Sequence, residues 1–306
     1  MMRLCWMLFS ALYATSLHAA MPPPKVEKIT ELVYALLGPE GLPDKKNQGY
    51  MVNSTVIIGE HGVILIDTGF NDEIGKHIAQ AIAKLTPKPV THIINTHHHG
   101  DHTLGNSAFP GAQVLSAQKC KELLLSVGYE WLDIIQNVLE RKFPNTKLVP
   151  ASVTFADGSS TERVIDGVKL RFIVPQGSHT PGDMMILLPD EKILIAGDIL
   201  VQHMAPSFRD AHVKHWISTL DEIAAMDIKI IVPGHGPLML PKQVPEMRAR
   251  MTKLYAAVEA GYKKGLTDAE IRKTLDLTEW RSMVSFEELM GMAISRTFLE
   301  IEQENF

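Results

Sequence analysis

The sequence has few cysteines, and this limits how the folded protein can be stabilised. Its 306 residues include two, Cys5 and Cys120. Cys5 lies in an N-terminal segment that has the outline of a secretion signal, so a processed chain would keep Cys120 alone. A lone thiol forms no intramolecular disulfide, and stability must therefore come from the hydrophobic core. Cys120 lies in a segment that we expect to be helical, where a buried structural thiol is favoured over a nucleophile.

Blocks of basic residues are missing as well. The formal net charge is −5 at pH 7. A mildly acidic chain without clustered Lys and Arg disfavours general nucleic-acid binding, so we predict no nucleic-acid partner. Internal repeats and low-complexity tracts are also absent. The composition, 45% hydrophobic and 21% charged, is typical of a soluble globular protein with one or two domains.

No stable membrane span is expected once the N-terminal segment has been removed. Arg3 precedes the apolar run Leu4–Tyr13, and small residues end at Ala20, which together form the outline of a secretory signal peptide. The run is shorter than the roughly 20 apolar residues that cross a bilayer, and no cysteine follows it that could carry a lipid anchor. We predict a signal peptide at residues 1–20 and a periplasmic or secreted location. The alternative is an uncleaved N-terminus that anchors the protein to a membrane.

What the sequence does have is a dense cluster of side chains that bind metals. The segment Thr96–His102 reads THHHGDH and follows the apolar run His92–Asn95. Neutral imidazole and ionised carboxylate are common ligands of zinc, so this segment is a candidate metal site. The alternative is an accidental histidine-rich loop or a tag-like tract. A tag, however, is expected at a terminus rather than between a strand and a helix.

The spacing within this cluster suggests ligands for more than one ion. If the chain leaves the strand in an extended form, His97 and His99 point to one side and His98 points to the other. Asp101 and His102, at the start of a following helix, then approach from a second direction. One segment could therefore supply two ligands to one metal ion and two to another.

Three later segments add single candidate ligands in the same type of setting. Each follows a short apolar run and contains a glycine turn: Gly177–Asp183 with His179, Gly197 with Asp198, and Pro233–Gly236 with His235. Together with Thr96–His102, these segments give four occurrences of the same arrangement, which argues against coincidence.

The series HHHGDH, SHTPGD, AGD and PGHG, in this order, resembles the metallo-β-lactamase-fold superfamily of metallohydrolases. The resemblance extends from about Ile29 to Leu238 and is specific for the fold and the metal site rather than for a substrate. It implies an α/β fold, an αββα sandwich of two mixed β-sheets flanked by helices. We accordingly expect a catalytic domain at residues 21–240 and a helical C-terminal extension at residues 241–306, packed on the same domain.

The resemblance also implies a site for two zinc ions that share a water or hydroxide. The expected ligands are His97, His99 and His179 for the first ion, Asp101, His102 and His235 for the second, and Asp198 for both. Zinc lowers the pKa of a bound water to about 7, and the metal-bound hydroxide would attack a carbonyl or similar group. Asp101 would also orient this hydroxide, which makes it the expected catalytic residue. Iron or manganese would suit the same types of ligand.

Two departures from the best-known members of the superfamily bear on the substrate. The largest subclass of zinc β-lactamases has a Cys ligand near the position of Asp198 and a Lys three residues later, where this chain has Val201. The Asp-bridged ligand set instead resembles that of glyoxalase II, lactonases and quinoprotein-associated metallohydrolases. We therefore predict an exported dinuclear zinc hydrolase that cleaves an ester, thioester, lactone or β-lactam bond in a small-molecule substrate.

Two other functions compete with this prediction. An iron-dependent oxidoreductase of the sulfur dioxygenase type would use similar ligands on the same fold, because imidazole and carboxylate suit both metals. A non-enzymatic accessory protein of an exported pathway is disfavoured by the complete set of expected ligands. The sequence does not determine the oligomeric state.

Residues outside the motifs give further expectations. The resemblance implies that Asp67 supports the metal-binding loop without binding metal, and that His98 points away from the ions. Tyr129 and Trp131 are more typical of packing than of substrate recognition.

Two loops could form walls of the site or be ordinary surface connections. They comprise residues 38–49, which are rich in turn-forming residues, and residues 202–210, which follow the expected bridging ligand. In the second loop His203 or Arg209 would be a polar contact for the substrate.

Hydrophobic periodicity predicts the elements between the motifs. Helices are expected at 71–85, at 117–142 with a break near Gly128, at 213–226, and beyond Leu240 at 244–262, 267–275 and 285–303. One or two strands are expected at 26–37, and single strands at 51–58, 63–66, 112–116, 184–188, 192–196 and 228–232. Strands at 153–155 and 167–174 are assigned to the second half of the sandwich.

Overall fold

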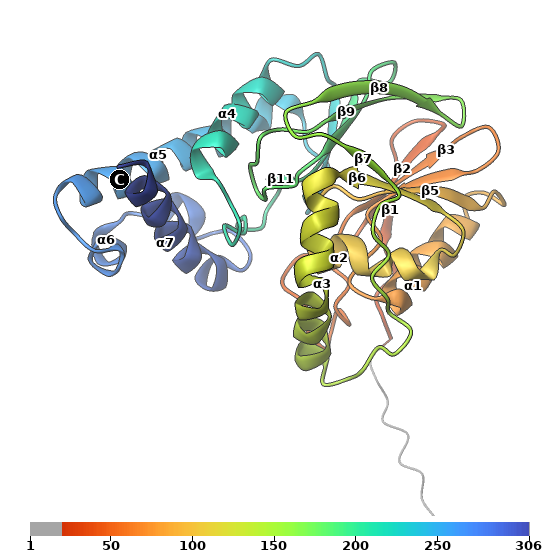
Figure 1. Ribbon diagram of the computed structural model, residues 1–306, viewed down its shortest axis with the longest axis horizontal. Coiled ribbons are helices and arrows are strands. Elements are labelled where there is room, and N and C mark those ends of the chain that lie inside the picture. The colour runs from red at the N-terminus through yellow and green to blue at the C-terminus, as the bar shows by residue number, and fades with distance from the viewer. Residues whose placement is uncertain (1–19, 306) are drawn as a thin grey trace, which may run out of the picture.

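The computed structural model describes residues 20–305 and contains two β-sheets, with one group of helices below them and a second group to their left in the view of Figure 1. The predicted signal peptide, apart from Ala20, lies outside the described residues. Within the described part of the chain, no helix is both long and apolar enough to cross a membrane.

The first sheet has seven strands that lie side by side in the order of the sequence. Strands β1 to β4 pair antiparallel, whereas β4 to β7 pair parallel. Val and Ile are frequent in β3, β4 and β5, as expected for strands that are buried on both faces. The strands are β1 (Lys25–Lys28), β2 (Val33–Leu37), β3 (Ser54–Ile58), β4 (Val63–Ile66), β5 (Val90–Ile94), β6 (Gln113–Ala117) and β7 (Val153–Phe155).

The second sheet has five strands in the order β12-β11-β10-β9-β8. Neighbouring strands from β8 to β11 pair antiparallel, and β11 pairs parallel with β12. The strands are β8 (Ser160–Ile165), β9 (Val168–Ile173), β10 (Met185–Leu188), β11 (Ile193–Val201) and β12 (Ile230–His235).

Apolar side chains of both sheets meet in a core between them. Ile64 and Ile66 of β4 belong to the same buried cluster as Ile195 of β11. Phe155 of β7 stacks on Phe172 of β9, with 4.2 Å between the ring centroids. Residues that alternate along each strand therefore point into a shared interior.

Helices cover the outer faces of the two sheets. In α1 (Asp72–Ala83), Ile74 and Ile78 are one turn apart and pack in the same buried cluster as the first sheet. The long helix α3 (Gln118–Leu139) covers this face as well. On the second sheet, Trp216 of α4 (Val213–Ala224) is fully buried. These four layers confirm the predicted αββα sandwich.

The C-terminal part of the chain is helical, as predicted. Met251 of α5 (Val244–Lys263) and Ile294 of α7 (Phe286–Glu304) share a buried cluster with Trp216 of α4. The remaining short helices are α2 (Gly100–Thr103), η1 (Leu104–Ala108), η2 (Pro241–Gln243), α6 (Asp268–Thr274) and η3 (Thr278–Trp280). The division of the chain at residue 240 into domain and extension stays a prediction.

Two expected elements differ from the structure, and one strand was not expected. Helix α3 runs through Gly128 without the predicted break, because this glycine serves close packing: a Cβ there would lie 2.8 Å from a methyl carbon of Leu148. Strand β7 belongs to the first sheet, where it pairs with β6. Strand β8 was not predicted, because most of its side chains are exposed at the edge of the second sheet and lack an apolar face.

Candidate metal centre

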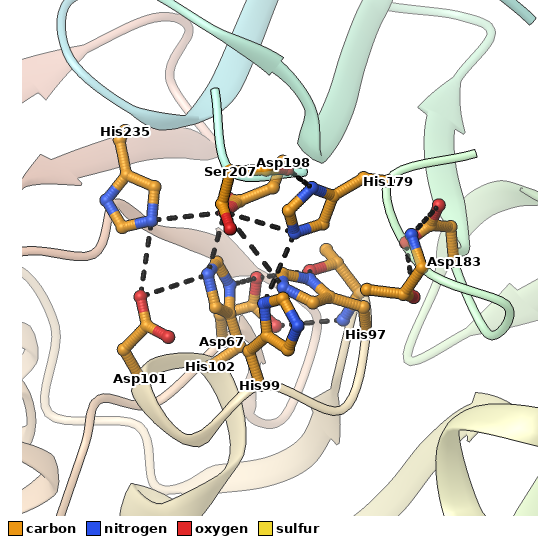
Figure 2. A network of polar contacts seen from close by, with 12 residues as sticks. Asp67, His97, His99, Asp101, His102, His179, Asp183, Asp198, Ser207 and His235 are labelled. Atoms are coloured by element: carbon orange, nitrogen blue, oxygen red, sulfur yellow. Dashed lines mark hydrogen bonds and ion pairs between the residues drawn. The ribbon is translucent and has the colours of Figure 1, made fainter. Parts of the chain in front are cut away.

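The four motif segments meet at one edge of the two sheets, although they lie far apart in the sequence. The segment after β5 supplies four of the predicted ligands, and the loop before β10, strand β11 and strand β12 supply one each. Figure 2 shows these side chains pointing toward one another. All seven are buried, with at most 7% of each residue exposed: His97, His99, Asp101, His102, His179, Asp198 and His235.

The first predicted group brings three imidazoles to one oxygen of Asp198. The Nε2 atom of His179 lies 3.2 Å from Nδ1 of His99 and 3.6 Å from Oδ2 of Asp198. The Nε2 atom of His97 lies 4.0 Å from the same oxygen. Four possible donor atoms therefore surround one small space.

The second predicted group is built around Asp101. Its Oδ2 atom lies 3.3 Å from Nε2 of His102 and 3.2 Å from Nε2 of His235. Asp198 reaches this group too, since its Oδ1 lies 3.3 Å from Nε2 of His102 and its Oδ2 lies 3.4 Å from Nε2 of His235. Asp198 thus stands between the two groups, as a bridging ligand must.

The separations fit tetrahedral metal coordination. Zinc bonds of roughly 2.1 Å place tetrahedral donor atoms about 3.4 Å apart, and the separations within the two groups are 3.2–4.0 Å. Three of the donors, His97 Nε2, His102 Nε2 and Asp198 Oδ1, are buried and have no hydrogen-bond partner in the described part of the chain. A buried polar atom without a partner costs about 1–3 kcal/mol, so an ion here would satisfy them.

The other ring nitrogen of each candidate histidine contacts an oxygen atom. Such outer contacts fix the tautomer and the orientation of metal-binding imidazoles. The contacts are His97 Nδ1 to Thr96 Oγ1 at 3.1 Å, His99 Nε2 to Asp210 Oδ2 at 2.9 Å, His102 Nδ1 to Asp67 Oδ2 at 2.8 Å, His179 Nδ1 to the Ser207 carbonyl at 3.0 Å, and His235 Nδ1 to the Met51 carbonyl at 3.0 Å. The rings are therefore held with their inner nitrogens toward the shared space.

Asp67 has the supporting position that the resemblance implied. It accepts hydrogen bonds from the backbone N–H of Thr96 at 2.9 Å, from the Thr96 hydroxyl at 2.7 Å and from His102 Nδ1. Its backbone has a φ of 58°, a left-handed conformation that is uncommon for a residue other than glycine. The turn after β4 thus holds the start of the metal-binding loop in place.

The two groups hold protons differently. Burial lowers the pKa of His97 well below its usual value and lowers the pKa of His179 to about 3. Burial also acts to lower the pKa of His102 and His235, but nearby carboxylates, including Asp101, outweigh it. They raise the pKa of His102 well above its usual value and that of His235 to about 10.

A cavity of about 310 Å³ opens beside the ligands. Both loops considered from the sequence contribute to it: Leu42 and Pro43 come from the first, and Met204, Ser207 and Arg209 come from the second. His203 does not line this cavity. Its Nδ1 atom lies 3.1 Å from a carboxylate oxygen of Glu40, beside a different cavity.

Trp131, for which packing was favoured over substrate recognition, lies beside one of the predicted ligands. Its ring lies 4.7 Å, centroid to centroid, from that of His99 and lines the metal cavity. Tyr129, two residues earlier, is 64% exposed and does not line it. Both are aromatic residues on one helix, so the sequence pattern does not distinguish them.

Asp210 is a further residue that the sequence did not single out as a contact of a ligand. Its Oδ2 atom contacts Nε2 of His99 and lies 3.8 Å from Nε2 of His98. His98 thus turns toward Asp210 and lies outside the two predicted ligand groups, although it forms a third possible metal-holding group with His99 and Asp210. Asp210 ends a loop without any motif, and its role follows from the fold alone.

Comparison with known proteins agrees with this geometry. The model of the metallo-beta-lactamase superfamily matches residues 47–235. A linear primary-alkylsulfatase from Pseudomonas sp. (strain ATCC 19151) is 25% identical over 267 residues, which are 72% of this chain and 49% of that protein. A metallo-beta-lactamase type 2 from Bacillus sp. (strain 170) is 28% identical over 192 residues, covering 60% of this chain and 66% of that protein. The chain thus spans about half the length of the alkylsulfatase and just under two thirds of that of the β-lactamase.

Solved structures show the same fold. A metallo-beta-lactamase from Pontibacter korlensis has a TM-score of 0.61 at 22% identity, covering 75% of this chain and 99% of its own. The stereoselective inverting sec-alkylsulfatase from Pseudomonas sp. has a TM-score of 0.67 at 18% identity, covering 90% of this chain and 50% of its own.

Proposed function

The chain belongs to the metallo-beta-lactamase superfamily, and on this premise we propose that it is an exported hydrolase that holds two zinc ions. The bond it cleaves would be an ester, thioester, lactone or β-lactam, and the alkylsulfatase relative extends the ester class to sulfuric esters. The observation that carries the proposal is the pair of ligand groups at tetrahedral spacing, with Asp198 common to both. The substrate would be a small molecule, since the cavity measures about 310 Å³.

The residues present fit such ions in number and in type of donor atom. Zinc ions held here would supply a water acidic enough to react near neutral pH and a positive charge for the oxygen that becomes negative. The chain itself orients the ligands through the five outer contacts of the histidine rings. It also limits the entry of bulk water, because the donor atoms are buried.

Asp101 is the residue that we expect to handle the proton of the attacking water. Burial acts to raise the pKa of its carboxyl, but His102 and His235 outweigh this and hold the pKa well below its usual value. Asp101 is thus ionised at neutral pH. It lines the cavity, its Oδ2 contacts the two histidines, and its Oδ1 would accept the hydrogen bond from the water.

The test is elemental analysis of protein that starts at Met21 and is purified without added metal. We expect about two zinc ions per chain and hydrolysis of at least one compound in a panel of lactones, thioesters, β-lactams and primary alkyl sulfates. His97→Ala and Asp198→Ala should lose metal and lower the hydrolysis rate at least about 100-fold. His61→Ala is the control, because the His61 side chain is 87% exposed and lies outside both groups.

Three results would contradict the proposal. They are the absence of stoichiometric metal, unchanged hydrolysis by the two ligand variants, and one iron per chain together with oxygen consumption on a persulfide. The last result would favour the oxidoreductase of the sulfur dioxygenase type.

A further inference from the structure

The metal cavity has an apolar wall built from two helices that lie far apart in the sequence. Trp131, Ile134 and Val138 of α3 line one side, and Leu289 and Met292 of α7 line another. The three α3 residues are spaced three and four positions apart, so they share one face of that helix. A site for a purely polar substrate would have no use for such a wall.

This wall is only partly covered by protein. Val138 is 37% exposed and Met292 is 44% exposed, whereas Leu289, deeper in the cavity, is 7% exposed. The cavity thus continues from the buried ligands to an open, apolar mouth between α3 and α7. An apolar chain longer than the cavity could extend through this mouth.

The cavity also holds one arginine that forms no direct ion pair in the described part of the chain. Arg209 is its only Arg or Lys within residues 20–305, and the guanidinium lies over the Trp131 ring, 4.5 Å from the centroid. The adjacent carboxylate of Asp210 contacts His99 instead. A guanidinium placed over an indole ring can still direct its N–H groups to a carboxylate or sulfate in a bidentate manner.

We propose that the cavity takes an amphiphilic anion, an ester whose apolar chain lies between α3 and α7 and whose negatively charged head group is held by Arg209 beside the metal ligands. The proposal rests on the proposed function, because it names the substrate class of the same site. It also assigns a role to the C-terminal helix α7, which supplies one of the two sides of the wall that contact the apolar chain.

The test measures binding rather than turnover, so that it does not depend on hydrolysis. Butane-, octane- and dodecane-1-sulfonate, which carry no ester bond, are titrated by calorimetry into zinc-loaded protein below their micelle concentrations. We expect the affinity to rise by up to about fourfold for each buried methylene group and to level off once the chain passes the mouth. Octanoate tests the carboxylate head, and octan-1-ol, which lacks the charge, should bind at least tenfold more weakly than octane-1-sulfonate.

Two surface residues of α7 provide a matched pair of variants. Met292 and Leu299 are 44% and 46% exposed on the same helix, but Met292 alone lines the cavity. Met292→Asp should weaken dodecane-1-sulfonate binding at least tenfold and leave butane-1-sulfonate binding unchanged, whereas Leu299→Asp should change neither. Arg209→Gln should remove the preference for sulfonate over alcohol at unchanged zinc content, and Arg209→Lys should keep part of it.

The inference is overturned if affinity does not depend on chain length, if the alcohol binds as tightly as the sulfonate, or if the Met292 and Leu299 variants behave alike. These outcomes are distinct from a failure of the proposed function. Chain-length-dependent binding without any hydrolysis would refute the hydrolase and keep the ligand class.

Discussion

Single residues set the order in which the two metal positions would lose their ions in acid. In the ion-free protein the pKa of His235 is about 10, so its ring is protonated at neutral pH, as is that of His102. An ion must displace these protons to bind. His97 and His179, with lowered pKa values, hold no proton near neutral pH.

Acidification should therefore release the second ion before the first. Because the pKa values of His102 and His235 are raised, the affinity of their position should fall roughly tenfold per pH unit for each proton displaced. Zinc counted after equilibration at limiting metal should be about two ions per chain at pH 8 and about one at pH 5. Calorimetry at pH 7 in buffers of different ionisation enthalpy should show proton release with the second ion. Simultaneous loss of both ions would contradict this assignment.

At the scale of secondary-structure elements, the close approach of β11 and β12 determines the position of the Asp198 carboxylate. Gly234 of β12 lies beside this carboxylate, and a Cβ on Gly234 would be 1.8 Å from Asp198 Oδ1. No other residue type fits there without moving the shared ligand. The glycine of the PGHG motif therefore serves the metal site through strand packing.

Gly234→Ala should disturb both ligand groups at once. We expect zinc to fall below one ion per chain and the free energy of unfolding to drop by about 1–3 kcal/mol, the usual cost of overpacking. Metal analysis and thermal unfolding followed by circular dichroism measure the two effects. Gly291→Ala in α7 is the control, because its Cβ would meet the flexible end of Arg272 at 3.2 Å. Full zinc content in the Gly234 variant would contradict the argument.

The elements that bear motifs could be predicted from the sequence, and the reason is chemical. His97, Asp101 and Asp198 are residue types that commonly bind metals, and their order along the chain resembles a known family. The structure brings them together at the expected edge. Their binding of zinc itself stays a prediction.

The wall of the cavity could not be predicted in the same way. Trp131, Leu289 and Met292 are apolar residues on helices, and their periodicity is the same whether a helix faces the core or an open cavity. Arg209 was weighed only as an alternative to His203, because the sequence does not show which of two polar side chains a loop turns inward. The packing of α3 and α7 in the folded protein determines which of these side chains line the cavity.

At the scale of the whole molecule, the protein suits an oxidising compartment. Cys120 is 1% exposed, and burial raises the pKa of its thiol to about 12. A thiol that is neither accessible nor ionised reacts slowly with oxidants or disulfides. The chain thus needs no partner cysteine, in agreement with the export that we propose.

Export can be tested with the full chain in a bacterial host. We expect the protein in the periplasmic fraction, with Met21 as its first residue by N-terminal sequencing, because residues 1–20 have the charge and length pattern of a cleaved signal. A chain without residues 2–20 is the control and should stay in the cytoplasm. Recovery of the intact N-terminus in the membrane fraction would instead support the anchored form.

The position of α7 has a consequence for how this protein could diversify. The helix begins at Phe286, far beyond the last proposed metal ligand at His235, yet its side chains border the same cavity. Mutations in α7 can therefore reshape the entrance without altering the ligand geometry. Separate stretches of one gene would then encode substrate selectivity and reactivity. Related proteins could therefore evolve new substrates while keeping the same set of ligands.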